Sequence, residues 1–373
     1  MSYGHICIAF TGGGTGGHVY PGLAIIEKLR ESYDGRIVWI GSGKAVERQA
    51  IEAAGVEYLC IPTGKLRRSL SLENLVDVFK VAAGFFHARG ILKRLKPALL
   101  FSKGGYVSVP PCLAAASLGI PFFTHESDLS PGLATRINAR KASHIFLGWQ
   151  KTHDSVPDSW KPRTSVSGNP VRAAITKGDP ATGRAWLGFD KNLPIILVLG
   201  GSQGARQLNE LTAALLPEMD KTARIAHQTG PDNAPCRVDD EFYKGFEFVH
   251  SELPNLMAAA DLVIGRAGAG TIAECAAAGK PMVLVPLTGA TRGDQIENAR
   301  LLEREGAALV FEGDEASPDA ILAALRPLLV DEGRRSAMAA AARKVVGSDA
   351  AGKIVDAILY YIKSKAEDEH EHP

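Results

Sequence analysis

The stretch AFTGGGTGGHVYPGLA, residues 9–24, places six glycines between a short apolar run and a helical pattern. Apolar residues fill positions 6–10, and residues 23–29 have the spacing of a helix that buries one face. Because glycine is costly in backbone entropy, a turn this rich in glycine predicts a close approach of the backbone to a ligand. The candidate ligands are a dinucleotide, a phosphate group and a sugar. A tight turn that binds nothing is the alternative.

The prediction that this loop binds a dinucleotide lacks its main support in the sequence. Gly12, Gly14 and Gly17 satisfy the G-x-G-x-x-G pattern between a strand and a helix. A dinucleotide-binding domain also carries an acidic residue about 20 residues later, at the end of its second strand. Here the strand expected at 36–41 leads into Gly-Ser without a carboxylate. The loop amides and the helix N-terminus suit an anion or a sugar hydroxyl instead.

Two side chains stand at the entry of this helix, Thr15 and His18. A histidine there can act as a base or bind a phosphate oxygen, because imidazole changes its charge near neutral pH. The alternative is a helix-start residue whose hydrogen bonds are satisfied by the backbone.

The composition indicates two ordinary domains without a strongly charged partner. The 373 residues carry a formal net charge of +1, so no global field calls for nucleic acid, and 46% of them are apolar. The five cysteines lack C-x-x-C spacing and are odd in number, which argues against a zinc site or a disulfide framework and fits a reducing cytoplasm. We find no signal-peptide pattern and no apolar run of about 18 residues. A soluble protein that can still contact a membrane is expected.

Strand-like apolar runs alternate with helical patterns, which predicts parallel sheets covered on both faces. Prolines and polar residues accumulate over 150–190, so a domain boundary is expected near Gly168. GGGTGGH opens the first half and GGSQGA the second. We therefore predict an α/β fold of two Rossmann-like doubly wound domains facing a cleft. The expected parts are a first domain at 1–167, a second domain at 168–345, a helix at 346–366 and a disordered tail at 367–373.

The expected elements follow from this alternation. In the first half the strands are 5–10, 36–41, 57–61, 98–101, 120–124 and 144–148, and the helices include 20–32, 45–54, 72–95 and 131–141. In the second half the strands lie in LPIILVL, ARIAHQTG, FEFVHS, DLVIGRAG and PMVLVPL.

The second half carries three candidate binding residues at expected helix starts. Ser202 in GGSQGA suits a diphosphate, or it is a simple N-cap. Glu274 is expected in the first turn of a helix that starts near Thr271, where it can accept hydrogen bonds from a ribose diol or complement the helix dipole. Gln295 can bind sugar hydroxyls, or it forms a solvated helix face with Asn298. No lysine has Walker spacing and no acidic pair suits a metal, so helix dipoles rather than magnesium are expected to hold a diphosphate.

Seven motifs occur in the order TGGGTGGHVYPGLA, KGGYVSVPPCLAAASLGIPFFTHES, SPGLATRINA, GNPVR, GGSQGARQLN, ADLVIGRAGAGTIAE and DQIENA. This ordered set, within residues 5 to 345, resembles the MurG family of peptidoglycan glycosyltransferases. These enzymes move N-acetylglucosamine (GlcNAc) from UDP-GlcNAc to undecaprenyl-pyrophosphoryl-N-acetylmuramyl-pentapeptide. The resemblance implies a GT-B fold, with the lipid acceptor at the first domain and the UDP-sugar at the second. It also implies that the C-terminal helix packs back onto the first domain.

The resemblance implies roles for single residues of the second domain. Arg172 and Ser202 contact the diphosphate region, Glu274 holds the uridine ribose, and Gln295 holds the GlcNAc hydroxyls. The family contacts uracil through backbone groups at a segment that is commonly Phe-Ile, and His250 occupies the second of these positions here. The residues of the first domain that approach the donor across the cleft are Thr15, Gly16 and Gly17.

The implied reaction is a single inverting displacement, in which the C4 hydroxyl of N-acetylmuramic acid attacks C1 of GlcNAc. A general base must take the hydroxyl proton. His18 is the first choice, Glu126 is its competitor, and Asp128 is a third candidate that also lies in the binding site. No metal or cofactor is implied. The expected substrates are UDP-GlcNAc and the lipid-linked acceptor. The protein is expected to be cytoplasmic and to bind peripherally to the inner face of the cell membrane. Other cell-wall synthesis proteins are expected partners, and nucleic acid is not.

Three further residues, in the first domain, depart from the family pattern. The family has His-Glu-Gln-Asn where this chain has HESD, so Ser127 replaces Gln and Asp128 replaces Asn. Aspartate keeps an acceptor oxygen but loses the amide donors and gains a charge, which is unfavourable near a diphosphate unless a cation compensates it. Lys103 stands where a small residue is usual.

A membrane-bound acceptor also predicts an apolar face with basic edges on the first domain. Residues 64–96 offer one, since Leu75, Phe79, Phe85 and Phe86 alternate with eight lysines and arginines. Charge reversal at Arg67 and Arg68 is expected to abolish vesicle binding. An ordinary core helix with solvated charges is the alternative.

Two other functions remain open at this point. One is a GT-B transferase with a different acceptor, such as diacylglycerol, or a different nucleotide sugar. The other is a non-catalytic paralogue that binds UDP-GlcNAc as a scaffold.

Overall fold

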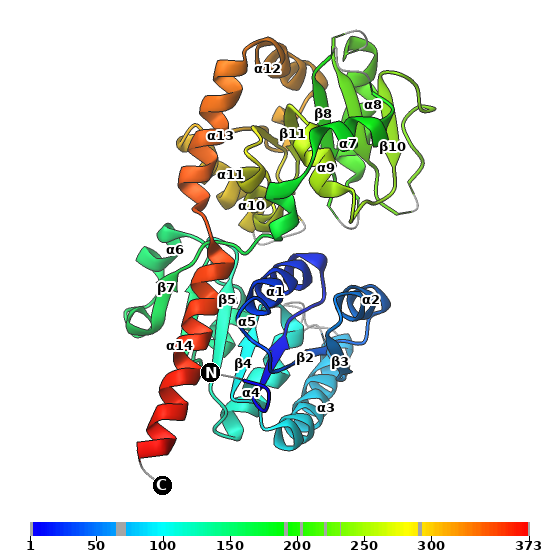
Figure 1. The fold of residues 1–373 in the computed structure, drawn as a ribbon. Helices are drawn as coiled ribbons and strands as arrows, with labels where there is room; N and C mark the ends of the chain where they lie inside the picture. Colours follow the sequence, from blue (N-terminus) through cyan, green and yellow to red (C-terminus); the bar gives the residue numbers. More distant parts are fainter. Residues whose placement is uncertain are drawn as a thin grey trace. The chain divides into compact units, whose positions relative to one another are not determined.

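The computed structural model describes residues 3–64, 72–189, 193–201, 204–219, 222–231, 233–289 and 293–371. The chain divides into two compact units, here called the first unit (Met1–Pro170 with Asp349–Pro373) and the second unit (Val171–Ser348). Each contains a parallel sheet with helices on both faces (Figure 1). The prediction of two doubly wound α/β domains is therefore confirmed.

The sheet of the first unit has the strand order β3-β2-β1-β4-β5-β6-β7 among the described residues. Its strands are β1 (Cys7–Thr11), β2 (Arg36–Gly41), β3 (Glu57–Cys60), β4 (Leu99–Ser102), β5 (Phe122–Glu126), β6 (His144–Leu147) and β7 (Thr164–Val166). Its helices are α1 (Gly16–Leu29), α2 (Ala45–Ala53), α3 (Leu72–Leu95), α4 (Val109–Ser117), α5 (Leu133–Asn138), α6 (Gln150–Ser155) and α14 (Ala350–Glu371). The short edge strand β7 was not predicted.

Successive side chains of β1 point to opposite faces of the sheet and pack in two separate hydrophobic cores. Ile8 and Phe10 pack in a cluster that includes residues of α1 and α14. Ala9 packs in the cluster on the opposite face, with residues of α3 and α4. The C-terminal helix α14 thus completes the core of the first unit by burying Ile354 and Ile358.

Helix α14 extends further than the sequence analysis predicted. It continues to Glu371, so the prediction of a disordered tail from residue 367 is wrong up to that residue. The segment KAEDEHE consists largely of residues that favour helices or tolerate them, and residues 350–371 contain no proline.

The sheet of the second unit has the order β10-β9-β8-β11-β12-β13 among the described residues. Its strands are β8 (Ile195–Leu199), β9 (Arg224–Gln228), β10 (Tyr243–Phe246), β11 (Leu262–Gly265), β12 (Met282–Leu284) and β13 (Ala308–Val310). Its helices are α7 (Pro180–Leu187), α8 (Arg206–Met219), α9 (Leu253–Ala259), α10 (Ala269–Ala278), α11 (Asp294–Arg304), α12 (Pro318–Val330) and α13 (Glu332–Val346). Strand β10 precedes most of the predicted segment FEFVHS, because the buried Tyr243 and its neighbours, not residues 247–251, pair with β9.

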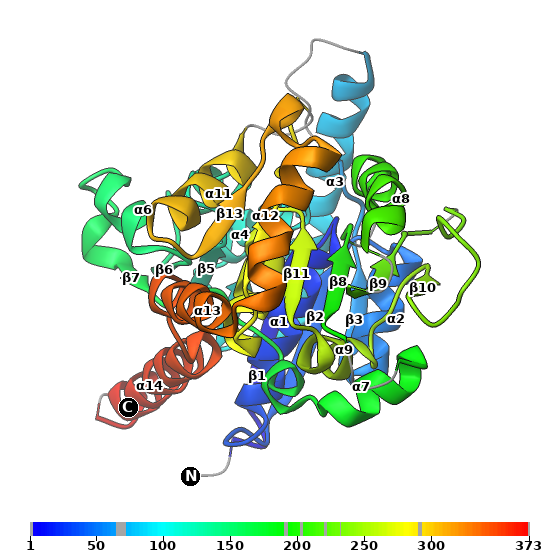
Figure 2. The same ribbon diagram turned by 90° about the horizontal axis from the view of Figure 1, so that it is seen from above.

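Helices α8 and α12 cover one face of this second sheet, and α9 and α10 lie on the other (Figure 2). Ile196 and Val198 of β8 point into the core that α8 and α12 share.

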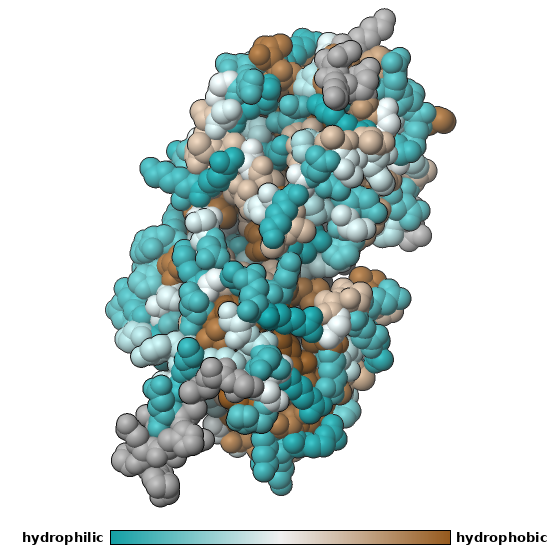
Figure 3. All heavy atoms as spheres, viewed as in Figure 1, coloured by the Kyte–Doolittle hydropathy of each residue, from teal (hydrophilic) through white to brown (hydrophobic). Residues whose placement is uncertain are grey.

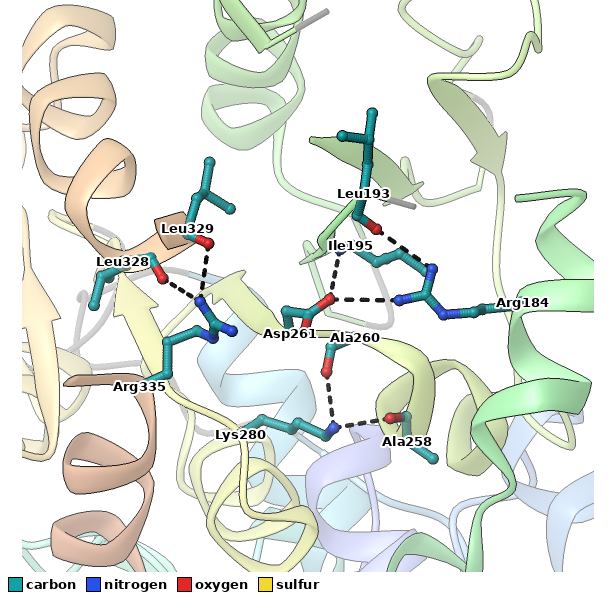
Figure 4. Close-up of polar contacts among 10 residues, drawn as sticks. All are labelled: Arg184, Leu193, Ile195, Ala258, Ala260, Asp261, Lys280, Leu328, Leu329 and Arg335. Atoms are coloured by element: carbon teal, nitrogen blue, oxygen red, sulfur yellow. Dashed lines mark hydrogen bonds and ion pairs between the residues drawn. The ribbon is translucent and has the colours of Figure 1, made fainter. Parts of the chain in front are cut away.

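Charged side chains fix the amino-terminal edge of this sheet (Figure 4). Asp261, just before β11, accepts a hydrogen bond from the Ile195 N–H at 2.8 Å and pairs with Arg184 at 3.7 Å. The Lys280 ammonium donates to two carbonyls at the end of α9, at 2.9 and 2.8 Å. Arg335 does the same for two carbonyls at the end of α12, at 2.6 and 3.0 Å. Cations thereby satisfy helix carbonyls that lack partners within the helix.

Gly22→Ala is expected to lower the free energy of unfolding. A Cβ at Gly22 would lie 2.5 Å from the Cη2 atom of Trp39, which is fully buried. Overpacking a filled core costs about 1–3 kcal/mol, and the better helix propensity of alanine offsets at most about 1 kcal/mol of this. Urea unfolding measures the change.

Gly90→Ala in α3 is the matched control, because no atom lies within 4 Å of its added Cβ. This variant should gain roughly 0.5–1 kcal/mol. Equal gains in both variants would show that Trp39 does not constrain α1.

Candidate active site

The candidate site of the first unit lies where the strand order reverses, between β1 and β4. The loop after β1 and the loop after β4 approach each other at this carboxyl edge. Gly105 permits the approach, since its φ is +77° and a Cβ there would lie 2.6 Å from the Gly13 carbonyl oxygen. The added atom would also lie 3.3 Å from the ring of His18. The two glycine loops therefore contact each other next to the His18 ring.

His18 is the third residue of α1 and is half-buried. Its Nδ1 atom lies 3.0 Å from the hydroxyl oxygen of Thr15, which is the N-cap residue of α1. The Thr15 side chain does not cap the helix, so its hydroxyl serves the imidazole instead. Burial, together with the positive charge of Lys103, lowers the pKa of His18 to about 4. The imidazole is therefore neutral at neutral pH and can accept a proton.

Thr15, Gly16 and Gly17 form the entry to α1. The Thr15 side chain and Gly17 are exposed, and Gly16 is half-buried. The free N–H groups of a helix N-terminus are suited to bind an anion or a hydroxyl oxygen.

Glu126, at the end of β5, is buried and fixes the loop that follows it. One carboxylate oxygen accepts the Asp128 N–H at 3.0 Å and the other accepts the Gly132 N–H at 2.9 Å. Both oxygens are thus engaged with the backbone, which suits a loop-fixing group better than a proton acceptor. Asp128 is half-buried in the same loop.

Lys103, which the sequence shows only as a departure from the family pattern, lies in this site. Its side chain is 1% exposed, and its ammonium donates to the Ser127 hydroxyl oxygen at 2.6 Å. Burial lowers the pKa of Lys103 to about 8, while the carboxylates of Glu126 and Asp128 oppose that shift. Two departures, Lys103 and Ser127, are therefore direct partners.

Glu47 was missed by the sequence analysis altogether. Its buried carboxylate accepts hydrogen bonds from the Ser42 N–H and hydroxyl, both at 2.8 Å, and from the Tyr58 hydroxyl at 2.9 Å. A longer contact of 3.4 Å joins it to the Gly14 N–H. It therefore holds the glycine loop through internal contacts and is not arranged as a ribose receptor. A glutamate six residues after the end of a strand gave no signal of this role.

The second unit brings together three of the predicted residues. Arg172 lies 3.3 Å from a carboxylate oxygen of Glu274 and 2.9 Å from Nδ1 of His250. Burial raises the pKa of Glu274, and the Arg172 charge opposes that shift. Desolvation and Arg172 both lower the pKa of His250. Ser202 lies outside the described residues.

Glu274 is the sixth residue of α10, which begins at Ala269. Its predicted position in the first helical turn is wrong, because Ala-Gly-Thr continues the helix upstream. The helix dipole therefore does not explain Glu274, whereas its contact with Arg172 does.

Gln295, in the first turn of α11, accepts the Leu287 N–H through its side-chain oxygen at 3.0 Å. Asn298 is buried and donates to the Ala267 carbonyl at 3.2 Å. The alternative of a solvated face formed by these two residues is wrong. Both side chains tie α11 to the loops at the carboxyl edge of the sheet.

Among the described residues, no group of three or more His, Cys, Asp or Glu is arranged to hold a metal ion. The expectation of a metal-free site stays a prediction.

Comparison with known protein families gives two matches. Residues 8–147 match the glycosyltransferase family 28 N-terminal domain, and residues 195–355 match the glycosyltransferase family 28 C-terminal domain. The two matches contain the site residues described above, except Arg172.

Individual relatives of the chain are also glycosyltransferases by name. A Treponema denticola protein named UDP-N-acetylglucosamine–N-acetylmuramyl-(pentapeptide) pyrophosphoryl-undecaprenol N-acetylglucosamine transferase is 44% identical, over 97% of this chain and 99% of its own length. A Bacillus cereus transferase 2 of the same name is 43% identical over 82% of this chain and 87% of its own. The crystal structure of Acinetobacter baumannii MurG has a TM-score of 0.72 at 26% identity and covers 95% of this chain and 99% of that chain. CalG4, the calicheamicin glycosyltransferase, has the same fold at 17% identity, with a TM-score of 0.71 and coverage of 97% and 99%.

Stability is expected to fall from about pH 6.5 to about pH 4, in part because of His18. Its folded pKa of about 4 lies below the ordinary value of 6.5. Between these values the unfolded chain binds a proton that the folded chain does not, so acidification favours unfolding, and above this range the effect is absent. Urea unfolding across this range should give a smaller loss for His18→Gln than for the wild type. Identical pH dependence in the two proteins would contradict the assignment.

Proposed function

The chain belongs to glycosyltransferase family 28, within its MurG branch, and on this premise we propose that it transfers GlcNAc from UDP-GlcNAc to undecaprenyl-pyrophosphoryl-N-acetylmuramyl-pentapeptide. The attacking group is the C4 hydroxyl of N-acetylmuramic acid, and C1 of GlcNAc inverts from α to β. The observation that carries the proposal is the 44% identity to a transferase of that name along 97% of the chain.

His18 is the general base in this proposal. For its Nε2 to accept the hydroxyl proton, Nδ1 must carry the other proton and donate it to Thr15, which lies within hydrogen-bond distance. The low pKa of His18 keeps this acceptor unprotonated. Glu126 is less suited because backbone N–H groups occupy its carboxylate. Asp128 then serves as a hydrogen-bond acceptor for the sugar.

The donor nucleotide binds to the second unit in this proposal. Glu274 accepts hydrogen bonds from the ribose hydroxyls, since a carboxylate has acceptor sites beyond the one that Arg172 engages. Arg172 orients Glu274 and, with Ser202, offsets the charge that develops on the departing diphosphate. Backbone groups at His250 contact uracil.

The sugar and phosphate contacts complete this assignment. Gln295 binds the GlcNAc hydroxyls, and its anchored position in the first turn of α11 supports that role. The helix entry formed by Thr15, Gly16 and Gly17 offers its amides to the donor. Helix N-termini and side chains hold the diphosphate without a metal ion.

Transfer of radiolabel from UDP-GlcNAc to a short-chain lipid acceptor tests the function. Labelled disaccharide is expected, with little product from UDP-GalNAc or with diacylglycerol as acceptor. His18→Ala should lower kcat at saturating donor by about 10²–10⁴-fold, the usual contribution of a general base. His5→Ala, which changes an exposed histidine at the start of the chain, is the control. Product from diacylglycerol would favour a different acceptor, UDP-GlcNAc binding without any product would favour a scaffold, and an unchanged kcat in His18→Ala would exclude this base.

The proposal includes a surface that meets the membrane. Among the described residues, no helix is both long enough and apolar enough to cross a bilayer. Helix α3 instead exposes an apolar stripe at helical spacing, in which Phe79 is 67% and Phe86 is 70% exposed. Lys93 and Arg94 are exposed in its last turn. Figure 3 shows apolar side chains gathered on the first unit around α3. Arg67 and Arg68 lie outside the described residues.

The double variant Phe79→Ser/Phe86→Ser should bind vesicles that contain phosphatidylglycerol at least about tenfold more weakly. Burying one phenylalanine contributes about 1.5 kcal/mol or more, and about 1.4 kcal/mol is tenfold in affinity. Val238→Ser removes an apolar side chain that is 86% exposed in the second unit and is the matched control. Vesicle sedimentation measures the binding. Equal binding by the double variant and the control would exclude α3 as the docking surface.

A further inference from the structure

The segment SPGLATRINA, residues 130–139, contains an enclosed polar side chain that the site described so far does not use, that of Asn138. Asn138 is the last residue of α5 and is 1% exposed. Its amide nitrogen Nδ2 donates a hydrogen bond to the hydroxyl oxygen of Ser108 at 3.0 Å and makes a longer contact of 3.4 Å with that of Ser102. Its side-chain oxygen has no hydrogen-bond partner among the described residues. An enclosed oxygen without a partner is unfavourable for folding, so stability alone does not account for an asparagine at this position.

Two serines connect Asn138 to the glycine loop that follows β4. Ser108, which directly precedes α4, donates to the Gly105 carbonyl oxygen through its hydroxyl at 2.8 Å and through its N–H at 3.1 Å. The hydroxyl oxygen of Ser102, the last residue of β4, accepts the Gly104 N–H at 3.2 Å. Both serines are 0% exposed. The two glycines are therefore held from the interior of the first unit, one by its N–H and the other by its carbonyl.

Gly104 and Gly105 need such external support because glycine has more backbone freedom than any other residue. Their φ angles are +87° and +77°, in the left-handed region that glycine enters as readily as the right-handed one. Two adjacent glycines therefore lose much conformational entropy when they adopt a single conformation. Hydrogen bonds from enclosed side chains offset that loss and select one path for the loop.

The path of this loop determines what lies beside the ring of His18. A Cβ added at Gly105 would lie 3.3 Å from both Cδ2 and Cε1 of His18, and one added at Gly104 would lie 3.7 Å from Cδ2. On its other side the ring has the contact of 3.0 Å between Nδ1 and the Thr15 hydroxyl. A single hydrogen bond leaves an imidazole free to tilt about the bond, whereas packing against a fixed loop restricts that tilt. The orientation of His18 thus depends on both contacts.

We propose that Asn138 is a positioning residue for His18. Through Ser108 it fixes the loop at Gly104 and Gly105, and the loop holds the imidazole in the orientation from which Nε2 meets the acceptor hydroxyl. The inference rests on the proposed function for the identity of the group that His18 contacts. Neither Asn138 nor Ser108 touches a substrate.

A double-mutant cycle tests whether Asn138 acts through His18. Leucine has the same number of side-chain heavy atoms as asparagine but no donor. Asn138→Leu should lower kcat by roughly tenfold to 10²-fold, since an error of about 1 Å in the position of a catalytic group can have an effect of this size. The donor KM should not change, because the donor nucleotide binds to the second unit. In a His18→Ala background the same substitution should cause little further loss. Losses that multiply in the double variant would overturn the proposal.

Ser108→Ala tests the link between Asn138 and the loop, and Ser117→Ala is its matched control. Ser117 ends α4, and its hydroxyl donates to the carbonyl oxygen three residues earlier at 2.8 Å, as the hydroxyl of Ser108 does. Removing the Ser108 hydroxyl should lower kcat in the direction of Asn138→Leu, whereas removing the Ser117 hydroxyl should leave kcat unchanged. Equal kcat values in the two serine variants would contradict the proposed link.

Titration of His18 by NMR gives a readout that does not need turnover. Burial, with the Lys103 charge, lowers the pKa of His18 to about 4. Release of the loop admits water to the ring, so Asn138→Leu and Ser108→Ala should move the pKa of His18 upward, toward 6.5. The neighbouring charged or titratable side chains, Lys103 and His125, are the same in every variant.

A general loss of stability would lower the folded fraction without moving this pKa, so the titration separates positioning from folding. If the wild type transfers no sugar to the lipid acceptor but the titration shifts as expected, the proposed function fails and the positioning role stands. An unchanged pKa of His18 in Asn138→Leu would overturn the positioning role, whatever the activity.

Discussion

The burial of strands β1 and β8 on both faces is the constraint on which the rest of the structure depends. Every residue of each strand is buried, so neither face can offer a polar site. In a parallel sheet covered on both faces, binding sites can form only at the ends of the strands. At the carboxyl ends, the point where the strand order reverses brings helix N-termini together. Thr15, His18 and Glu126 all follow or lie beside strand ends of this kind. The opposite edge of the second sheet is closed by Asp261 and its partners instead.

The carboxylates at this edge have different tasks, and their hydrogen bonds distinguish them. Glu47 and Glu126 accept backbone N–H groups, so they set the paths of loops. Glu274 instead pairs with the Arg172 side chain through one oxygen. A sequence shows all three simply as glutamates near glycine-rich turns. Only the partners reveal which of them is committed to the backbone.

The sequence predicted the fold and the family well, because both depend on patterns that lie within single segments. Apolar runs and glycine turns defined the strands around Ile8 and Ile196, and the ordered motifs identified the family that the comparisons confirm. The start of α10 was misplaced because Gly270 reads as a turn residue although it lies within the helix. The partners of Lys103 and Glu47 could not be predicted, because they are brought together across different strands of the folded sheet. The roles assigned to the site residues stay predictions.

Two side chains of the first unit, His18 and Lys103, differ in their protonation at neutral pH. A group that accepts a proton must be unprotonated, whereas a group that supplies a positive charge must carry a proton. A histidine at neutral pH cannot satisfy both conditions, and the low pKa of His18 keeps its imidazole neutral. The ammonium of Lys103 satisfies the second, and its charge helps to keep His18 neutral. Arginine would also remain charged, but its planar guanidinium has five donors to satisfy, and the Lys103 side chain is 1% exposed with one hydroxyl partner. The site therefore favours a compact cation that is kept separate from the neutral imidazole.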